Sequence, residues 1–175
     1  MFAVKASQYL THMKRLTDLD QGIRRFYEAI RPLADSPKLG PVLWQLPERM
    51  KADPPLLESA LDSLPPGRHC FEFRHPSWFS DEVLELLRFH HAALVIAHHP
   101  ERPWQPHELT ADWTFLRFHY GARGRRGNYS ETELREWAPQ VRELARDAEV
   151  FAYFNNDWEG FAVRNALFLR GLLSG

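Results

Sequence analysis

The stretch FEFRHPSW, residues 71–78, places Glu72 and Arg74 two positions apart between phenylalanines. Side chains along a β-strand point alternately to its two faces, so Glu72 and Arg74 are predicted to share one face, and Phe71 and Phe73 the other. The proline that follows cannot continue the strand. An unpaired buried charge costs on the order of several kcal/mol. The two charges are therefore expected either to pair with each other or within the sheet, or to bind a ligand.

Six short apolar runs, including this one, are typical of strands that are buried on both faces. They are FAVK (2–5), PVLWQL (41–46), CFEFR (70–74), ALVIA (93–97), WTFLRFH (113–119) and VFAYFN (150–155). Between them apolar residues recur every three or four positions, which predicts amphipathic helices. These helices are expected over residues 19–34, 54–64, 80–91, 130–145 and 158–173, and the proline-rich stretch 98–109 is expected to be a loop. Asp53, Ser80 and Ser130 are expected to cap three of these helices, Ser130 as part of a capping box with Glu133.

Regular alternation of strands and helices favours a parallel sheet, either an open doubly wound sheet or a (β/α)8 barrel. Polar side chains follow five of the six strands, and only a barrel brings all these carboxyl ends to one mouth. They are Lys5, Gln45, Glu72 with Arg74, Arg117 with His119, and Asn155 with Asp157. No GxGxxG motif follows the first strand, which disfavours a dinucleotide-binding fold. The prediction is a single α/β, TIM-barrel-like domain over residues 1–175, with about six of eight units and the deficit at the N-terminus.

Composition and charge restrict the classes of function. The chain has 175 residues, 44% hydrophobic and 26% charged, as in a globular protein. Its 22 Lys and Arg residues nearly balance 23 Asp and Glu residues, which disfavours a large charged surface for nucleic acid or membranes. No apolar run approaches a membrane span of roughly 20 residues, and no signal peptide is evident. The single cysteine, Cys70, excludes an internal disulfide, favours the cytoplasm and is expected to be buried.

Five ordered motifs together resemble the YecE-like family, domain of unknown function seventy-two. They are FAVKASQYLTH (2–12), LGPVLWQLP (39–47), FEFRHPSW (71–78), ADWTFLRFHYG (111–121) and YFNNDWEGFAVRNALFL (153–169). The resemblance implies a TIM-barrel fold in which FAVK is the third strand and FAYFN the eighth, with no established activity. It also implies that the first two strand–helix units are absent and that His98-His99 replaces a common family aspartate.

The predicted catalytic residues are Glu72 and His119. Glu72 is interpreted as a general base or metal ligand, and His119 has an intrinsic pKa suited to proton transfer near neutrality. Arg74 and Arg117 are expected to bind an anion. Other residues predicted to bind substrate are Lys5, Gln45, Tyr129, Asn155, Asn156 and Asp157.

The loop after WTFLRFH combines glycines with basic residues. Gly121, Gly124 and Gly127 would let backbone amides approach a phosphate, as in the loops after the last strands of TIM barrels. The alternative is a solvated loop whose arginines, at 123, 125 and 126, contact nothing.

The stretch YFNND carries two amides and a carboxylate that suit sugar hydroxyls, a base edge or a hydrated cation. Asp157 alternatively caps the helix that follows. No HExxH or CxxC spacing is present, so a structural zinc is not expected. A loosely held Mg²⁺ or Mn²⁺ at Glu72, His119 and Asp157 remains an alternative. The sequence identifies no cofactor.

Two classes of function remain open. The first is an enzyme that acts on a small phosphorylated or otherwise anionic substrate by general acid/base chemistry. The second is a non-catalytic barrel that binds a nucleotide or nucleic acid, and an inactive truncated barrel is a third alternative. Exposed strand edges in an incomplete barrel would favour self-association.

Overall fold

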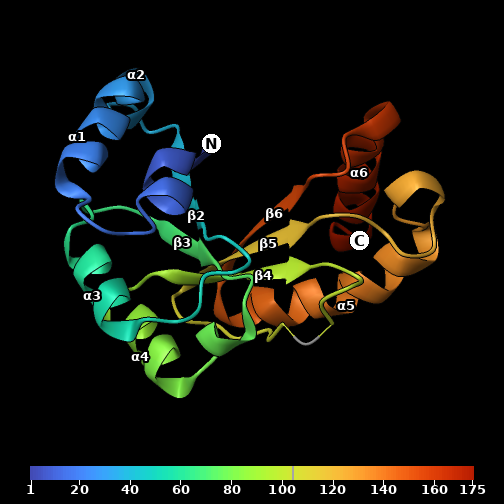
Figure 1. The fold of residues 1–175 in the computed structure, drawn as a ribbon. Helices are drawn as coiled ribbons and strands as arrows, with labels where there is room; N and C mark the ends of the chain where they lie inside the picture. The colour runs from blue at the N-terminus through green and yellow to red at the C-terminus, as the bar shows by residue number, and fades with distance from the viewer. Residues whose placement is uncertain (104) are drawn as a thin grey trace. The chain divides into compact units, whose positions relative to one another are not determined.

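Six parallel strands organise the computed structural model, which describes residues 1–103 and 105–175 (Figure 1). They are β1 (Phe2–Lys5), β2 (Leu39–Gln45), β3 (His69–Glu72), β4 (Ala93–His98), β5 (Trp113–Phe118) and β6 (Glu149–Phe154). Each strand is hydrogen-bonded to its neighbours in chain order, and every pair is parallel. Among the described strands the order is therefore never reversed, whereas a doubly wound sheet reverses it at a switch point.

The chain divides into two compact units, unit 1 (Met1–Leu94) and unit 2 (Val95–Gly175). The division falls within β4, whose residues Ala93 and Leu94 pair with β3, while Val95 and the following residues pair with β5. The prediction of a single domain stays a prediction.

Unit 1 is built around an aromatic ladder on the apolar face of β2 and β3. Trp44, Phe71, Phe73 and Trp78 stack in sequence, and the Phe73 and Trp78 rings lie 4.6 Å apart and 2° from parallel. Its helices α1, α3 and α4 cover this face (Figure 1). The helical elements of unit 1 are a π-helix (Tyr9–Met13), α1 (Asp20–Ala29), α2 (Arg31–Ala34), α3 (Pro54–Asp62), a 3-10 turn (Pro76–Trp78) and α4 (Asp81–Phe89).

Unit 2 packs two long helices against β5 and β6. Phe118 stacks on Phe154 at 4.5 Å and meets Tyr129 and Trp137 edge-on. This cluster continues into the apolar side of both helices. The helical elements of unit 2 are a 3-10 turn (Arg125–Gly127), α5 (Glu131–Asp147), a second 3-10 turn (Trp158–Gly160) and α6 (Phe161–Leu173).

The predicted strands and helices are confirmed, with shifted ends. The helix expected over 19–34 is divided at Ile30, which separates α1 from α2. Predicted capping by Asp53, Ser80 and Ser130 is confirmed, and Ser130 forms a full capping box. The stretch 98–109 contributes only the end of β4 and loop among its described residues, and Trp104 lies outside them.

The expectation that all six strands are buried on both faces is wrong for β1 and β6. Phe2 is 60% exposed, and β6 is only partly buried along its length. Both strands stand at an end of the hydrogen-bonded order, so each has one neighbouring strand instead of two. The strands between them are almost wholly buried.

Cys70 is a fully buried free cysteine whose Sγ lies 3.6 Å from the Val42 carbonyl oxygen, as expected of a small apolar side chain. Among the described residues, every helix is too short or too polar to cross a bilayer.

Candidate functional site

A row of polar side chains lies at the carboxyl ends of β1, β2 and β3 in unit 1. Lys5 Nζ donates to Gln45 Oε1 at 2.7 Å, and Gln45 Nε2 donates to Glu72 Oε1 at 2.9 Å. Arg74 Nε donates to the same Glu72 oxygen at 3.3 Å. Strand register brings these residues together, because Gln45 is paired directly with Glu72. Four predicted site residues therefore form one hydrogen-bonded row.

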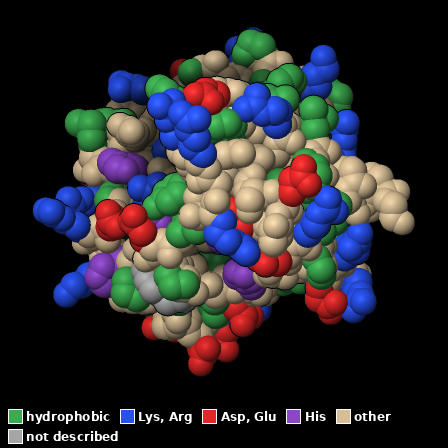
Figure 2. All heavy atoms as spheres, turned by 90° about the vertical axis from the view of Figure 1, so that its right-hand side faces the viewer, with side chains coloured by type: hydrophobic (Ala, Val, Ile, Leu, Met, Phe, Trp, Pro, Cys, Tyr) green, Lys and Arg blue, Asp and Glu red, His purple; other side chains and the backbone are tan. Residues whose placement is uncertain are grey.

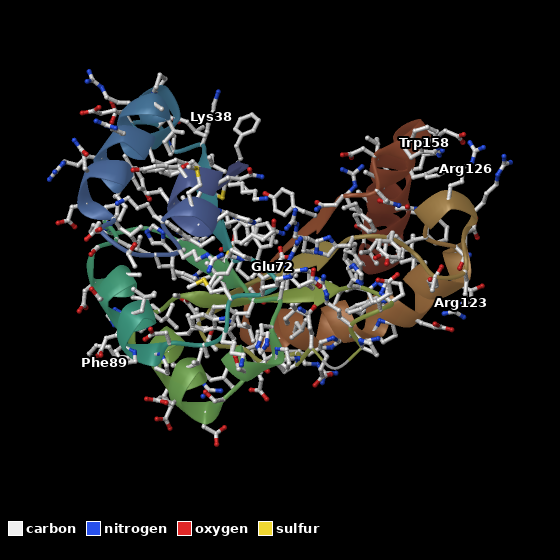
Figure 3. The ribbon with its side chains drawn as sticks, in the orientation of Figure 1. Lys38, Glu72, Phe89, Arg123, Arg126 and Trp158 are labelled. Atoms are coloured by element: carbon white, nitrogen blue, oxygen red, sulfur yellow. The ribbon has the colours of Figure 1, made fainter. Side chains whose placement is uncertain are left out.

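The carboxylate in this row is buried while both cations reach solvent. Glu72, labelled in Figure 3, is 1% exposed. The Arg74 side chain is 25% exposed, and Lys5 is an exposed residue. Phe71 and Phe73 point into the apolar core as predicted. The ion pair between Arg74 and Glu72 agrees with the pairing alternative, and both cations are accessible to solvent.

His12, in the π-helix that follows β1, belongs to this site and was missed from the sequence. Burial lowers the pKa of His12, and the positive charges of Lys5 and Arg74 lower it further. Thr11 Oγ1 lies 3.2 Å from the Ser7 carbonyl oxygen and 2.8 Å from His12 Nδ1, and the latter contact orients the His12 ring. The sequence offered no signal beyond the position of His12 at the end of the FAVKASQYLTH motif, because a π-helix has no familiar apolar period.

Unit 2 brings together a second pair of predicted residues. With the Asn155 amide oxygen turned toward Arg117, Arg117 Nε donates to Asn155 Oδ1 at 2.8 Å. These side chains come from the ends of the neighbouring strands β5 and β6, and the Asn155 amide N–H donates to the Phe118 carbonyl at 2.8 Å. His119 is held through its own amide, which donates to the His98 carbonyl at 3.1 Å. Its ring centre lies 5.6 Å from that of His99.

In unit 2 the backbone amides of the glycine-rich loop bind a carboxylate of the protein itself, that of Glu133. Glu133 Oε1 accepts from the amides of Ala122 and Arg123 at 2.7 and 3.2 Å. Its other oxygen accepts from Ser130, and these hydrogen bonds lower the pKa of Glu133 although burial opposes them. The cap by Ser130 is predictable from the sequence, whereas this second role of Glu133 depends on the fold of the loop and was not predicted.

The close packing of this loop explains why it contains glycines. A Cβ atom on Gly124 would lie 1.8 Å from the Asn128 carbonyl oxygen, because the two sides of the loop approach closely. The Gly121 amide N–H donates to the Gly127 carbonyl at 3.0 Å across the same turn. Loop closure therefore accounts for these glycines without a bound phosphate.

Two of the three loop arginines form ion pairs. Arg123 pairs with Glu136 of α5, and Arg126 pairs with Glu159 at 3.1 Å. The Arg126 guanidinium also lies 5.8 Å from the Trp158 ring centre (Figure 3). The expectation that these two side chains contact nothing is wrong, because acidic residues of unit 2 lie within reach.

Tyr129 and Asn156 are buried links rather than exposed contact residues. The Tyr129 side chain is 1% exposed, and its hydroxyl lies 2.7 Å from His98 Nδ1. Asn156 Nδ2 donates to Asn165 Oδ1 at 2.8 Å and to the Gly127 carbonyl oxygen at 3.1 Å. Asn165 also accepts from the Tyr129 amide at 3.3 Å. Together they connect the loop, the end of β6 and α6, and their predicted role in substrate binding stays a prediction.

The predicted cap by Asp157 is wrong. Helix α6 begins at Phe161, and its N-cap is Gly160, which has a left-handed backbone (φ 70°). Asp157 precedes the 3-10 turn instead, and its side chain makes no capping hydrogen bond. The turn inserts three residues between the acidic side chain and the first helical amides.

The described residues contain no group of three or more His, Cys, Asp or Glu side chains arranged to hold a metal ion. Glu72 belongs to unit 1, and His119 and Asp157 belong to unit 2. The alternative of Mg²⁺ or Mn²⁺ at these residues stays a prediction.

Comparisons with known proteins are consistent with the fold. The model of the family described as "Protein of unknown function DUF72" matches residues 1–175. A crystal structure of a DUF72 family protein from Thermotoga maritima is 31% identical, with a TM-score of 0.89, over 99% of this chain and 74% of that one. A DUF72 family protein from Enterococcus faecalis is 23% identical, with a TM-score of 0.77, over 91% of this chain and 67% of that one. A search of curated proteins found no match.

Proposed function

Since this chain belongs to the DUF72 family, whose function is unknown, we propose that it binds a small anionic, phosphate-bearing substrate at the Lys5–Gln45–Glu72–Arg74 row. We further propose that it acts on this substrate by general acid/base chemistry. The observation that carries the proposal is the hydrogen-bonded row itself, in which two cations, Lys5 and Arg74, accompany a single carboxylate, that of Glu72. Burial lowers the pKa of the neighbouring His12, and the charges of Lys5 and Arg74 lower it further. A site where two cations disfavour a third positive charge has a positive potential, and such a potential attracts an anion.

Arg74 is proposed to bind the anion directly. Its Nε is committed to Glu72, which fixes the plane of the guanidinium and leaves its terminal Nη groups as donors for a ligand. A planar guanidinium held in this way can donate two parallel hydrogen bonds to a phosphate or carboxylate. Lys5 adds a compact charge on the neighbouring part of the row.

His12 is proposed to transfer the proton, together with the Glu72 carboxylate. A lowered pKa keeps His12 neutral near pH 7, and the nitrogen lone pair of a neutral imidazole suits a general base. Glu72 is 1% exposed and already accepts two hydrogen bonds, so its first role is to hold Gln45 and Arg74 in position. The catalytic role of His119 stays a separate prediction.

We also propose that the strand–helix array is of the TIM-barrel class. Parallel strands paired strictly in chain order support this class over a doubly wound sheet. The carboxyl ends of the strands are the usual place for a barrel's active site.

The binding step can be tested by calorimetric titration with inorganic phosphate and with glycerol 3-phosphate. Arg74→Gln removes the proposed donor, and we expect its affinity to fall about 10- to 100-fold, as for loss of a charge-assisted hydrogen bond. The matched control is Arg31→Gln, which removes an exposed arginine whose partner is Asp35 on the same face of its helix. Equal losses in both variants, or none in Arg74→Gln, would refute the proposed anion site.

The catalytic step needs a separate measurement. If a phosphorylated metabolite is found that the protein turns over, His12→Gln is expected to lower kcat about 100-fold or more with little change in binding. An unchanged kcat in His12→Gln would show that another group transfers the proton.

A further inference from the structure

Unit 2 contains a pocket of about 430 Å³ that the proposed function does not use. Its walls come from the end of β4, the loop that follows it, the glycine-rich loop and one side of α5. This volume lies within the range of small-molecule sites. The residues that matter for its chemistry are His98, Arg102, His107, Arg123, Glu133 and Trp137.

A hydrogen bond with Tyr129 fixes the ring of His98 in this pocket. The Tyr129 hydroxyl is buried, so its proton needs an acceptor. The Tyr129 hydroxyl therefore donates its own proton to His98 Nδ1, at 2.7 Å. Burial raises the pKa of Tyr129 and lowers that of His98, so the tyrosine keeps its proton and the imidazole is neutral. His98 consequently carries its hydrogen on Nε2, as a donor for a ligand in the pocket that it lines.

An aromatic wall lies beside this donor. Trp137 is 6% exposed, and its ring centre lies 5.1 Å from the His98 ring and 5.4 Å from the His107 ring. His107 is an exposed residue whose ring packs beside that of Trp137, and partial burial of the imidazole lowers its pKa. Imidazole and indole faces of this kind favour offset stacking with another flat ring.

The formal charges of the described side chains that line this pocket sum to zero. With histidines counted as neutral, the wall carries two arginines, Arg102 and Arg123, and two glutamates, Glu133 and Glu136. Arg123 pairs with Glu136, and Glu133 is held by the loop amides. A ligand with a net charge would therefore lose hydration while facing charges of both signs, so the lining favours neither an anion nor a cation over a neutral ligand.

We propose that this pocket is a second binding site, which takes an uncharged aromatic or heteroaromatic ring bearing a hydrogen-bond acceptor. The ring packs against Trp137 and His107, and the acceptor receives the His98 Nε2 hydrogen. The inference uses residues of unit 2 alone and does not depend on the anion site of unit 1.

Benzamide, benzoate and benzamidinium have nearly the same shape but differ in charge. Comparing their affinities therefore separates the effect of ligand charge from that of ligand shape. Each is titrated into ¹⁵N-labelled protein to about 10 mM, since fragments of this size bind weakly. We expect benzamide to shift the amide signals of the pocket residues and the Trp137 indole signal, with an affinity at least about tenfold above that of either ion. Binding of benzoate or benzamidinium as tight as that of benzamide, or an absence of benzamide-dependent shifts in the pocket, would overturn the proposal.

Two variants locate the binding. Gln140→Trp places a large side chain at an exposed position of the pocket wall and is expected to weaken benzamide binding at least about tenfold. The matched control is Gln21→Trp, an exposed helical glutamine in unit 1, which should leave the affinity unchanged. If Gln140→Trp fails to fold, the exposed His107→Ala substitution takes its place with the same expected loss. Unchanged affinity in a folded pocket variant would contradict the assignment.

Discussion

His69 is held neutral inside unit 1 by two hydrogen bonds of opposite sense. Trp44 Nε1–H donates to His69 Nδ1 at 3.1 Å, and His69 Nε2 donates to the Pro65 carbonyl oxygen at 2.8 Å. Burial lowers the pKa of His69, and the bond to Pro65 opposes this shift in part. A protonated ring would lose the hydrogen bond from Trp44, since Nδ1 would then carry a hydrogen.

Acid is therefore expected to destabilise the protein through His69. The unfolded chain takes up its proton near pH 6.5, above the folded pKa, so the stabilisation is complete above that pH and is lost as the pH falls toward the folded pKa. The slope is at most about 1.4 kcal/mol per pH unit for each proton. Urea unfolding from about pH 7.5 to 5.5 should show a shallower slope in His69→Gln than in the wild type. Because the pKa values of His98 and His107 are also lowered, part of the slope should remain.

At the level of elements, Glu133 joins a helix start to a loop. One carboxylate oxygen completes the capping box of α5, and the other accepts two amides of the glycine-rich loop. These donors lie in different segments, so a single side chain sets the position of the loop relative to the helix.

Glu133→Gln is expected to lower the free energy of unfolding by about 1–3 kcal/mol, because an amide replaces a buried carboxylate that accepts several hydrogen bonds. Glu136→Gln is the matched control: it removes an exposed carboxylate of the same helix, which pairs with the Arg123 side chain, and it should change stability little. Denaturation of both variants at neutral pH distinguishes them. Equal effects would show that the loop amides do not depend on Glu133.

How far the sequence predicts these elements depends on the range of the interactions. The strand that ends within FEFRHPSW, its alternation and the caps of three helices follow from neighbouring residues, and the structure confirms them. The row from Lys5 to Arg74 was also predicted, because carboxyl ends of parallel strands meet. The π-helix that places His12 and the folding of the loop onto Glu133 depend on contacts that no local period records.

At the scale of the whole molecule, charge is balanced and mixed. The net charge is −1, and basic and acidic side chains are interspersed on the face shown in Figure 2. Arg123 and Arg126 are paired with glutamates. A surface that binds nucleic acid would instead carry a continuous stripe of basic residues.

Oligonucleotide binding is accordingly expected to be weak. Anisotropy of a labelled single-stranded oligonucleotide at about 50 and 200 mM salt should show little binding at either concentration. Replacing Arg123, Arg125 and Arg126 together by glutamine should change this little. Tight binding that falls steeply with salt and disappears in the triple variant would favour the nucleic-acid alternative over the anion site.

The most direct test of the central claim is the pKa of His12, followed by NMR with and without inorganic phosphate. An anion bound by Lys5 and Arg74 offsets the charges that lower this pKa, so phosphate is expected to raise it. Arg74→Gln should raise it without phosphate and should weaken the response to phosphate. A His12 pKa that changes neither with the Arg74→Gln substitution nor on addition of phosphate would contradict the proposed anion site.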